Sequence, residues 1–322
     1  MWKTLPVFGV VVIVAFAALA RPVRGKAPDP RPRPRVSGLN LDAFSPAAPA
    51  DPIDLAFLHH SVGAQLLAAP GPIDGSIDGY PTHPNGGNLA ALLAANGYRL
   101  HEATYGSRLG EHTDLFDWLP KFRANMDDIL ALAHQNDQLP AGERNRVVVF
   151  KSCFPNNRFV TGLAGEPDPL GPELTLRNAQ AAMAALRGEL ARRPDVLFVY
   201  VTAPPLAAPQ WLEPSWKRYA KRLLNKPTLA ELDAESAGLA RAFNTWVKDP
   251  AAGWLASYQG RNIVVFDLHD LLTDSGASDY SRYASLDGTD SHPSSGGNAK
   301  AAAAFVPFLN RAVRFAGVTA SR

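Results

Sequence analysis

The chain has 322 residues, 46% of them hydrophobic and 19% charged, with a formal net charge of +2. These totals are those of a soluble globular protein with one large domain or two modest ones. A charge so close to neutral argues against a nucleic-acid partner, which favours a basic face. The single cysteine, Cys153, excludes an internal disulfide and a zinc site built from several thiolates.

Residues 1–20 have the pattern of a targeting segment. Lys3 supplies a short positive end, residues 5–20 form an uncharged apolar run, and Ala18-Leu19-Ala20 fits a small-x-small cleavage site. The run is shorter than the roughly 20 residues of a membrane span. We therefore expect a signal peptide and export to the periplasm or the extracellular space. The alternative is an uncleaved anchor that associates with a membrane, and the basic residues that follow the run resist export.

Residues 21–53 are rich in Pro, Arg and Ala and show no hydrophobic periodicity. Such a composition predicts a flexible or partly extended linker. The folded domain is expected to begin at Asp54 and to run to residue 322.

Five apolar segments rich in β-branched and aromatic residues predict the strands of this domain. They are residues 55–60, 99–105, 147–153, 196–203 and 263–268. The last three are nearly continuous apolar runs, which are typical of strands covered on both faces. Between and after the strands, amphipathic patterns predict helices over residues 89–96, 119–134, 174–192, 229–247 and 300–315. This alternation predicts an α/β protein with a five-stranded, mostly parallel sheet between two helical layers.

Polar residues stand where four of these strands end. They are Ser61, the run Tyr105-Gly106-Ser107, residues 152–157 and residues 202–205. Ligands of open α/β sheets bind beyond the carboxyl ends of the strands. We therefore expect the functional site at this edge.

Ser61 and the segment Asp290-Ser291-His292 have the residue types of a catalytic triad. A serine hydroxyl needs an adjacent base to act as a nucleophile, and the base needs an acid to orient it. Ser61 is accordingly the predicted nucleophile, His292 the base and Asp290 its partner. Each has a simpler interpretation: Ser61 could be only a helix N-cap, and the Asp-x-His segment could be a turn with a surface histidine.

Three groups are predicted to form an oxyanion hole: the backbone N–H of Ser61, the backbone N–H of Gly106 and the side-chain amide of Asn156. Gly106 could equally be an ordinary turn glycine, and Asn157 is as well placed by sequence as Asn156.

The remaining candidates are two histidines, the cysteine and an aromatic insert. His59 and His60 are adjacent on a strand and point to opposite faces. One of them could join Asp290 and His292 at a metal, but packed core histidines are the more common case, and we expect no metal and no cofactor. Cys153 is expected to be a buried small hydrophobe. Residues 209–226, which include three aromatic residues, could form a lid, a sugar-stacking platform or a packed surface excursion.

Several local motifs resemble the SGNH (GDSL-like) hydrolase superfamily, and a poorly characterised bacterial branch of it. The motifs are His-His-Ser-Val-Gly, Phe-Lys-Ser-Cys-Phe-Pro-Asn, Val-Thr-Ala-Pro-Pro-Leu and Asp-Ser-His-Pro-Ser. The resemblance covers residues 54 to about 316 and implies a three-layer, flavodoxin-like α/β/α fold. It also implies Ser61 as nucleophile, Gly106 and Asn156 as oxyanion donors, His292 as base and Asp290 as its partner.

The chain departs from the family pattern at three places. His-His-Ser stands for the usual Gly-Asp-Ser, Ser-Cys-Phe-Pro-Asn-Asn stands for the Gly-x-Asn-Asp block, and the terminal pair is Asp-x-His where Asp-x-x-His is common. The resemblance implies an esterase or deacylase that removes an O-acyl group, acetyl in the first instance, from a small-molecule or carbohydrate ester. The alternatives are an O-acetyltransferase acting on a cell-surface carbohydrate and a catalytically dead carbohydrate-binding protein.

Overall fold

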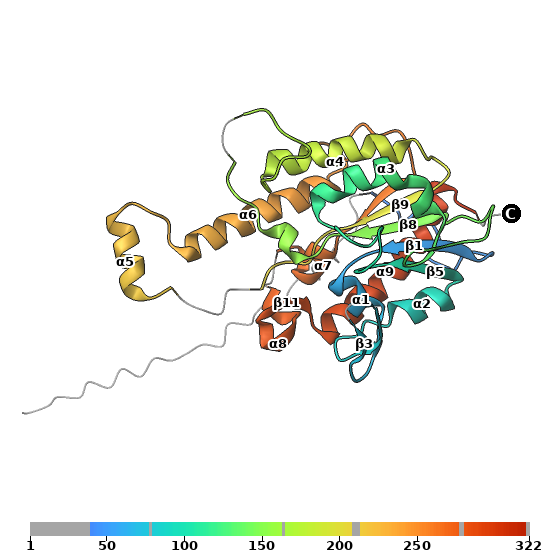
Figure 1. Ribbon diagram of the computed structural model, residues 1–322, viewed down its shortest axis with the longest axis horizontal. Helices are drawn as coiled ribbons and strands as arrows, with labels where there is room; N and C mark the ends of the chain where they lie inside the picture. Colours follow the sequence, from blue (N-terminus) through green and yellow to red (C-terminus); the bar gives the residue numbers. More distant parts are fainter. Residues whose placement is uncertain (1–38, 77–78, 163–164, 208–212, 277–279, 320–322) are drawn as a thin grey trace, which may run out of the picture. The chain divides into compact units, whose positions relative to one another are not determined.

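Figure 1 shows the computed structural model of the protein, which describes residues 39–76, 79–162, 165–207, 213–276 and 280–319. The predicted targeting segment and the first part of the predicted linker lie outside these residues. Within the described ranges, no helix is long and apolar enough to cross a membrane.

The described residues form an α/β fold around a seven-stranded, mostly parallel sheet of order β10-β9-β8-β1-β5-β6-β7. The five predicted strands are β1 (Ile53–Leu58), β5 (Tyr98–Ala103), β8 (Val147–Lys151), β9 (Leu197–Val201) and β10 (Ile263–Phe266). They pair in parallel, with β1 between β5 and β8. The carboxyl ends of all five therefore meet at one edge of the sheet.

The predicted count of five strands is wrong, because two short strands extend the sheet beyond β5. They are β6 (Leu132–His134) and β7 (Asp137–Gln138), and β7 runs antiparallel to β6. Neither segment contains a continuous apolar run, so nothing in the local pattern marks it as a strand. A separate three-stranded sheet of order β2-β4-β3 also went unpredicted; its strands are β2 (Ala69–Pro70), β3 (Asp74–Ser76) and β4 (Gly79–His83).

Alternate residues of the central strands face two hydrophobic clusters. In β1, Leu55 and Phe57 belong to one cluster, and Ala56 and Leu58 belong to the other. The first cluster includes residues of α1 (Ser61–Leu67), α2 (Leu89–Ala95), α7 (Leu268–Leu272) and α9 (Ser295–Ala316). The second includes residues of α3 (Trp118–Leu130), α4 (Leu176–Ala191) and α6 (Leu229–Lys248). Helices thus cover both faces of the sheet (Figure 1), which is why β8, β9 and β10 are apolar along nearly their whole length.

The predicted helices are present, with different ends. The helix expected over residues 119–134 stops at Leu130, because the chain then turns into β6. The helix expected to start at residue 300 starts at Ser295, where Ser294 caps it by accepting a hydrogen bond from the N–H of Gly297. This earlier start brings the last helix close to the Asp-x-His segment.

The described end of the predicted linker packs on α9. Leu41 is buried in the first hydrophobic cluster, and the rings of Phe44 and Phe315 meet edge to face with centroids 5.6 Å apart. Arg311 also donates to the carbonyl of Phe44, at 3.1 Å. Residues 41–44 are thus part of the folded unit, contrary to the predicted boundary at Asp54, because a short apolar pair in a Pro-rich stretch gives no periodic signal.

Candidate active site

Ser61 lies at the carboxyl end of β1, as the first residue of α1. The preceding residue, His60, occupies the N-cap position without a side-chain capping bond. Ser61 is therefore not the N-cap, and its hydroxyl does not cap the helix. The tight turn depends on Gly63, because a Cβ at this position would lie 2.4 Å from the Cβ of His59. The side chain that follows the strand is thereby held at the sheet edge, with Ser61 only 8% exposed.

A chain of hydrogen bonds links the three predicted triad residues. The Oγ of Ser61 lies 2.9 Å from the Nε2 of His292. The Nδ1 of His292 lies 3.0 Å from both carboxylate oxygens of Asp290. With a proton on Nδ1, Nε2 is free to accept the serine proton. The structure thus brings together the two ends of the folded domain in the geometry of a nucleophile, a base and an orienting acid.

Asp290 is fixed by several partners in and around β11 (Asp290–Pro293). The hydroxyl of Ser285 donates to its Oδ2 at 2.8 Å, and the backbone N–H of His292 donates to its Oδ1 at 3.3 Å. Burial raises the pKa of Asp290, but the hydrogen bonds from His292 and Ser285 outweigh it, so the pKa is lowered. Asp290 therefore stays a carboxylate at neutral pH. Sequence reasoning missed Ser285, which lies five residues before Asp290 and follows no motif.

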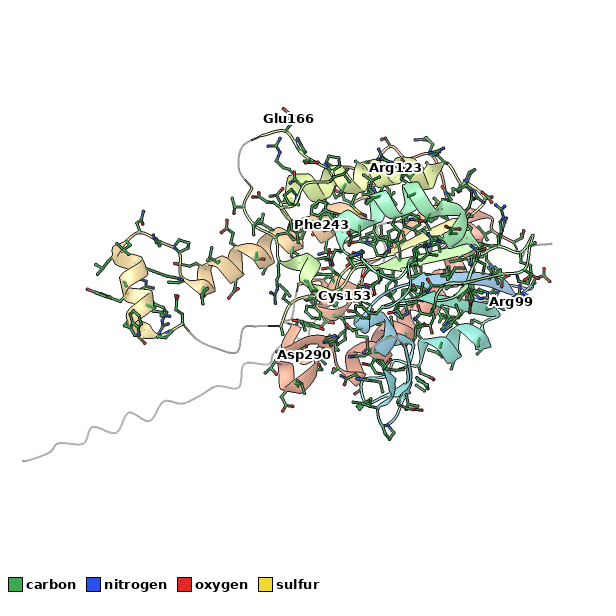
Figure 2. The ribbon with its side chains drawn as sticks, in the orientation of Figure 1. Arg99, Arg123, Cys153, Glu166, Phe243 and Asp290 are labelled. Carbon is green, nitrogen blue, oxygen red and sulfur yellow. The ribbon has the colours of Figure 1, made fainter. Side chains whose placement is uncertain are left out.

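The ring of His292 is also held from the side of β8. Phe154, in the short helix η2 (Phe154–Asn157) after β8, meets it edge to face with ring centroids 5.0 Å apart. Figure 2 labels Cys153, which precedes Phe154 in the sequence, and Asp290, which lies two residues before His292. Two strand ends and the segment before the last helix thus converge at one place.

The two histidines before Ser61 point apart, as expected for adjacent residues. The Nε2 of His59 lies 3.3 Å from Glu102, whereas the Nε2 of His60 donates to the carbonyl of Gly110 at 2.8 Å. Burial lowers the pKa of His60 to about 4, more than the bond to Gly110 raises it. His60 is therefore neutral at pH 7. Across the described residues, no group of three or more His, Cys, Asp or Glu side chains is arranged to hold a metal ion.

The predicted oxyanion donors already have partners inside the protein. The N–H of Gly106 donates to Oε1 of Glu111 at 2.6 Å, and the amide of Asn156 donates to Oδ1 of Asp114 at 2.8 Å. Asn157 is buried elsewhere, donating to the carbonyl of Pro204 at 2.8 Å. The assignment of Gly106 and Asn156 to an oxyanion hole stays a prediction, and it requires both groups to exchange these partners for the substrate.

Tyr105 is a neighbour of Ser61 to which the sequence analysis assigned no role. Its ring stacks on that of His60, with centroids 3.8 Å apart and planes at 20°. Burial raises the pKa of its hydroxyl, the nearby Cys153 adds to the rise, and hydrogen bonds with the hydroxyl and backbone of Ser61 oppose it without cancelling it. The phenol thus lies against Ser61 and keeps its proton at neutral pH. Its position at a strand end, immediately before Gly106, is the feature of the sequence that could have marked it as a site residue.

Cys153 is buried, as predicted, beside an equally buried lysine. The Nζ of Lys151 donates to the carbonyl of Ser152 at 2.9 Å and lies 3.8 Å from the Sγ of Cys153. Burial lowers the pKa of Lys151, and Cys153 opposes that change. This pair lies on β8 and its carboxyl end, close enough to His60 and Tyr105 to influence their pKa values.

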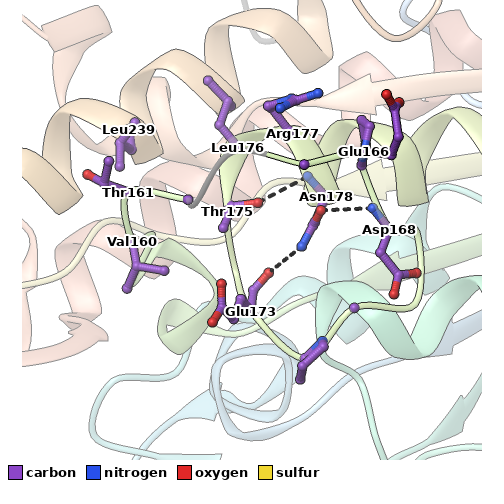
Figure 3. A pocket seen from close by; sticks show the side chains of 15 residues that line it. Val160, Thr161, Glu166, Asp168, Glu173, Thr175, Leu176, Arg177, Asn178 and Leu239 are labelled. Atoms are coloured by element: carbon purple, nitrogen blue, oxygen red, sulfur yellow. Dashed lines mark hydrogen bonds between the residues drawn. The ribbon is translucent and has the colours of Figure 1, made fainter.

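Figure 3 shows a pocket of about 300 Å³ that is separate from the triad. Its lining comes from the loop before α4, the first turns of α4 and Leu239 of α6. The amide of Asn178, in its centre, is already bonded to the backbone of Asp168 and Glu173. None of the three predicted triad residues lines this pocket.

Comparison with known proteins returned solved structures alone. No family model and no curated protein matches the chain. Among the matching structures is a catalytic mutant of Axe2, an acetylxylan esterase from Geobacillus stearothermophilus, at 12% identity and a TM-score of 0.39, covering 85% of this chain and 98% of that one. A tryptophan variant of the same esterase matches at 13% identity and a TM-score of 0.36, covering 85% and 98% of the two chains. The likeness is low, and it does not indicate the function of this chain.

Proposed function

We propose that the protein is an SGNH-type serine esterase or deacylase, which hydrolyses an O-acyl ester through an acyl-enzyme. One observation carries this proposal: the continuous hydrogen-bonded chain from Ser61 through His292 to Asp290. A surface histidine or a simple turn would not require a serine from the first strand of the domain at the Nε2 of His292. These hydrogen bonds favour a catalytic role for the site, and not a role in carbohydrate binding alone.

In the first half of the reaction, Ser61 Oγ attacks the ester carbonyl carbon while its proton passes to Nε2 of His292. The resulting tetrahedral oxyanion collapses, the bond to the alcohol oxygen breaks, and His292 returns the proton to the departing alcohol. In the second half, His292 takes a proton from water, whose oxygen attacks the acyl-enzyme. The carboxylic acid leaves, and Ser61 regains its proton. Asp290 holds the Nδ1–H tautomer and stabilises the imidazolium at each step.

The oxyanion needs donors that are available when it forms. The Tyr105 hydroxyl lies against Ser61 and keeps its proton, so we assign it as a donor. The Ser61 N–H, which donates to the Tyr105 oxygen, can join it once it exchanges that partner for the substrate. Gly106 and Asn156 can join them only after leaving Glu111 and Asp114. Losing one donor of this kind typically costs about 3–4 kcal/mol of transition-state stabilisation.

The nucleophile is tested with a fluorophosphonate probe, which bonds covalently to activated serines. We expect labelling of the wild type and none of Ser61→Ala. Labelling that survives this substitution, or that is absent from folded wild type, would remove the nucleophile assignment. Ser281→Ala is a matched control, because it removes an exposed serine hydroxyl in the segment before Asp290.

The reaction is tested with an aryl acetate and with acetylated oligosaccharides, in the presence of increasing concentrations of a sugar acceptor. Hydrolysis predicts free acetate at every acceptor concentration. If acetylated sugar replaces free acetate as the main product, the acetyltransferase alternative holds and the hydrolase proposal fails.

A further inference from the structure

The insert between β9 and α6 contains a short helix with an uncovered apolar side. This helix, α5 (Ser215–Leu223), has the sequence Ser-Trp-Lys-Arg-Tyr-Ala-Lys-Arg-Leu, and none of its nine residues is buried. Trp216 is 69% exposed, Tyr219 67% and Leu223 70%, and Leu224 at the helix end is 67% exposed. Trp216 and Tyr219 are the only exposed Trp, Tyr or Phe side chains in the part of the chain that the structure describes.

The apolar and basic residues of α5 segregate to opposite sides. At 3.6 residues per turn, the large apolar residues and Ala220 fall within an arc of about 100°. Lys217, Arg218, Lys221 and Arg222 fall on the other half of the helix, and α5 contains no acidic residue. Such a helix has a continuous apolar stripe bordered by positive charge.

Specific hydrogen bonds and an ion pair fix the C-terminus of α5 and its connection to α6. At its C-terminus, Asn225 adopts a left-handed conformation (φ 50°), and the N–H of Lys226 donates to the carbonyl of Lys221 at 2.8 Å. This is the Schellman pattern of a terminated helix. The buried Glu213 ties Lys221 to the start of α6 by pairing with its Nζ at 2.7 Å and accepting from the N–H of Leu229 at 3.2 Å.

A helix of this length is marginal in water unless its apolar side is covered. A second copy of α5 is a poor partner for the apolar side, because it would bring eight cations close together. A neutral polysaccharide could stack on Trp216 and Tyr219, but it carries no negative charge to match the basic side of the helix. A surface that carries both apolar chains and negative headgroups matches both sides of the helix.

We propose that α5 is a membrane-surface helix, whose Trp216, Tyr219 and Leu223 enter the interface of an anionic lipid bilayer. Lys217, Arg218 and Arg222 contact the headgroups, while Lys221 stays paired with Glu213. A separate part of the sequence points the same way. Residues 5–20 form an uncharged apolar run, and six basic residues follow between Arg21 and Arg35. Stable membrane attachment generally takes two signals, and α5 would be one of them.

The test places an environment-sensitive fluorophore on α5 through Leu223→Cys in the full-length protein. The native Cys153 is buried, so the new thiol is the accessible one. We expect a blue shift and a brighter signal on vesicles of phosphatidylcholine and phosphatidylglycerol, and no change on phosphatidylcholine alone. The matched control is the same fluorophore at Leu170→Cys, an exposed leucine in the loop before α4, which should not respond.

Charge is tested by Arg218→Gln together with Arg222→Gln. At about 1 kcal/mol per surface cation, losing two should weaken the partition into anionic vesicles by roughly 30-fold. Hydrolysis of a soluble aryl acetate should stay unchanged, which shows that the variant is folded. The corresponding control is Arg123→Gln with Arg192→Gln, which removes two exposed cations from α3 and the end of α4.

Three results would overturn the proposal. The fluorophore at position 223 could stay unchanged while the protein sediments with anionic vesicles, which would place attachment in another part of the chain. It could respond to soluble oligosaccharide without vesicles, which would identify a sugar platform. It could respond to rising protein concentration alone, which would identify self-association.

Discussion

Ser61 and His292 are 231 residues apart in the chain, and a hydrogen bond of 2.9 Å joins their side chains. The contact depends on β1 lying in the middle of the sheet and on α9 packing beneath it in the same hydrophobic cluster. The position of Ser61 is thus set by the core of the fold, whereas the position of His292 is set by the short β11 segment before α9.

Asp290→Asn should lower kcat on the order of 10³–10⁴-fold, because the amide no longer fixes the Nδ1–H tautomer of His292. The fold should be retained, since the two side chains have the same shape. Steady-state hydrolysis of an aryl acetate measures the effect. Asp287→Asn is the matched control, because it changes an exposed aspartate three residues away, and equal rates for the two variants would contradict the role of Asp290.

Acid should destabilise the protein partly through His60. Its pKa of about 4 in the folded protein is below the ordinary value of 6.5. The unfolded chain therefore binds the proton first, and stability present above pH 6.5 is lost as the pH falls towards 4. Because the ring is only partly buried and solvent screens the effect, the contribution is on the order of 1–2 kcal/mol. Denaturant unfolding at pH 7.5 and at pH 4.5 should show a smaller difference for His60→Gln than for the wild type.

The control for this pH effect is His112→Gln, which replaces an exposed histidine in the loop after Gly110. It should leave the loss of stability on acidification unchanged. Equal pH dependence in the His60 variant and the wild type would show that the His60 ring does not resist protonation.

Gly110→Ala should destabilise the fold by about 3 kcal/mol or more. Its Cβ would lie 1.9 Å from the carbonyl oxygen of Thr104, and backbone in a packed site cannot yield cheaply. Gly142→Ala is the contrast, because its φ of +95° is strained for alanine but the space around it is open. That strain costs about 1–2 kcal/mol. Chemical denaturation compares the two, and a smaller loss for Gly110→Ala would contradict the packing argument.

The sequence predicted two kinds of feature correctly: elements with a regular hydrophobic pattern, and polar residues at the ends of strands. Continuous apolar runs marked β8, β9 and β10, and the polar residues after the strands marked the edge where Ser61 and His292 meet. The short β6 and β7 could not be predicted, because they form only through pairing at the edge of a sheet already built. The hydrogen-bond partners of the predicted oxyanion donors could not be predicted either. Nothing in the sequence near Gly106 or Asn156 shows that these residues donate to Glu111 and Asp114.

Tyr105→Phe tests whether the Tyr105 hydroxyl is a donor to the oxyanion. The substitution keeps the ring that stacks on His60 and removes only the hydroxyl beside Ser61. If this hydroxyl donates to the oxyanion, kcat should fall on the order of 10²–10³-fold with little change in KM, because the bond is made mainly in the transition state. Tyr219→Phe, on α5, is the matched control. Full activity in the Tyr105 variant would contradict this role. Gly106 and Asn156 would then be the oxyanion donors, and they would have to leave Glu111 and Asp114 when substrate binds.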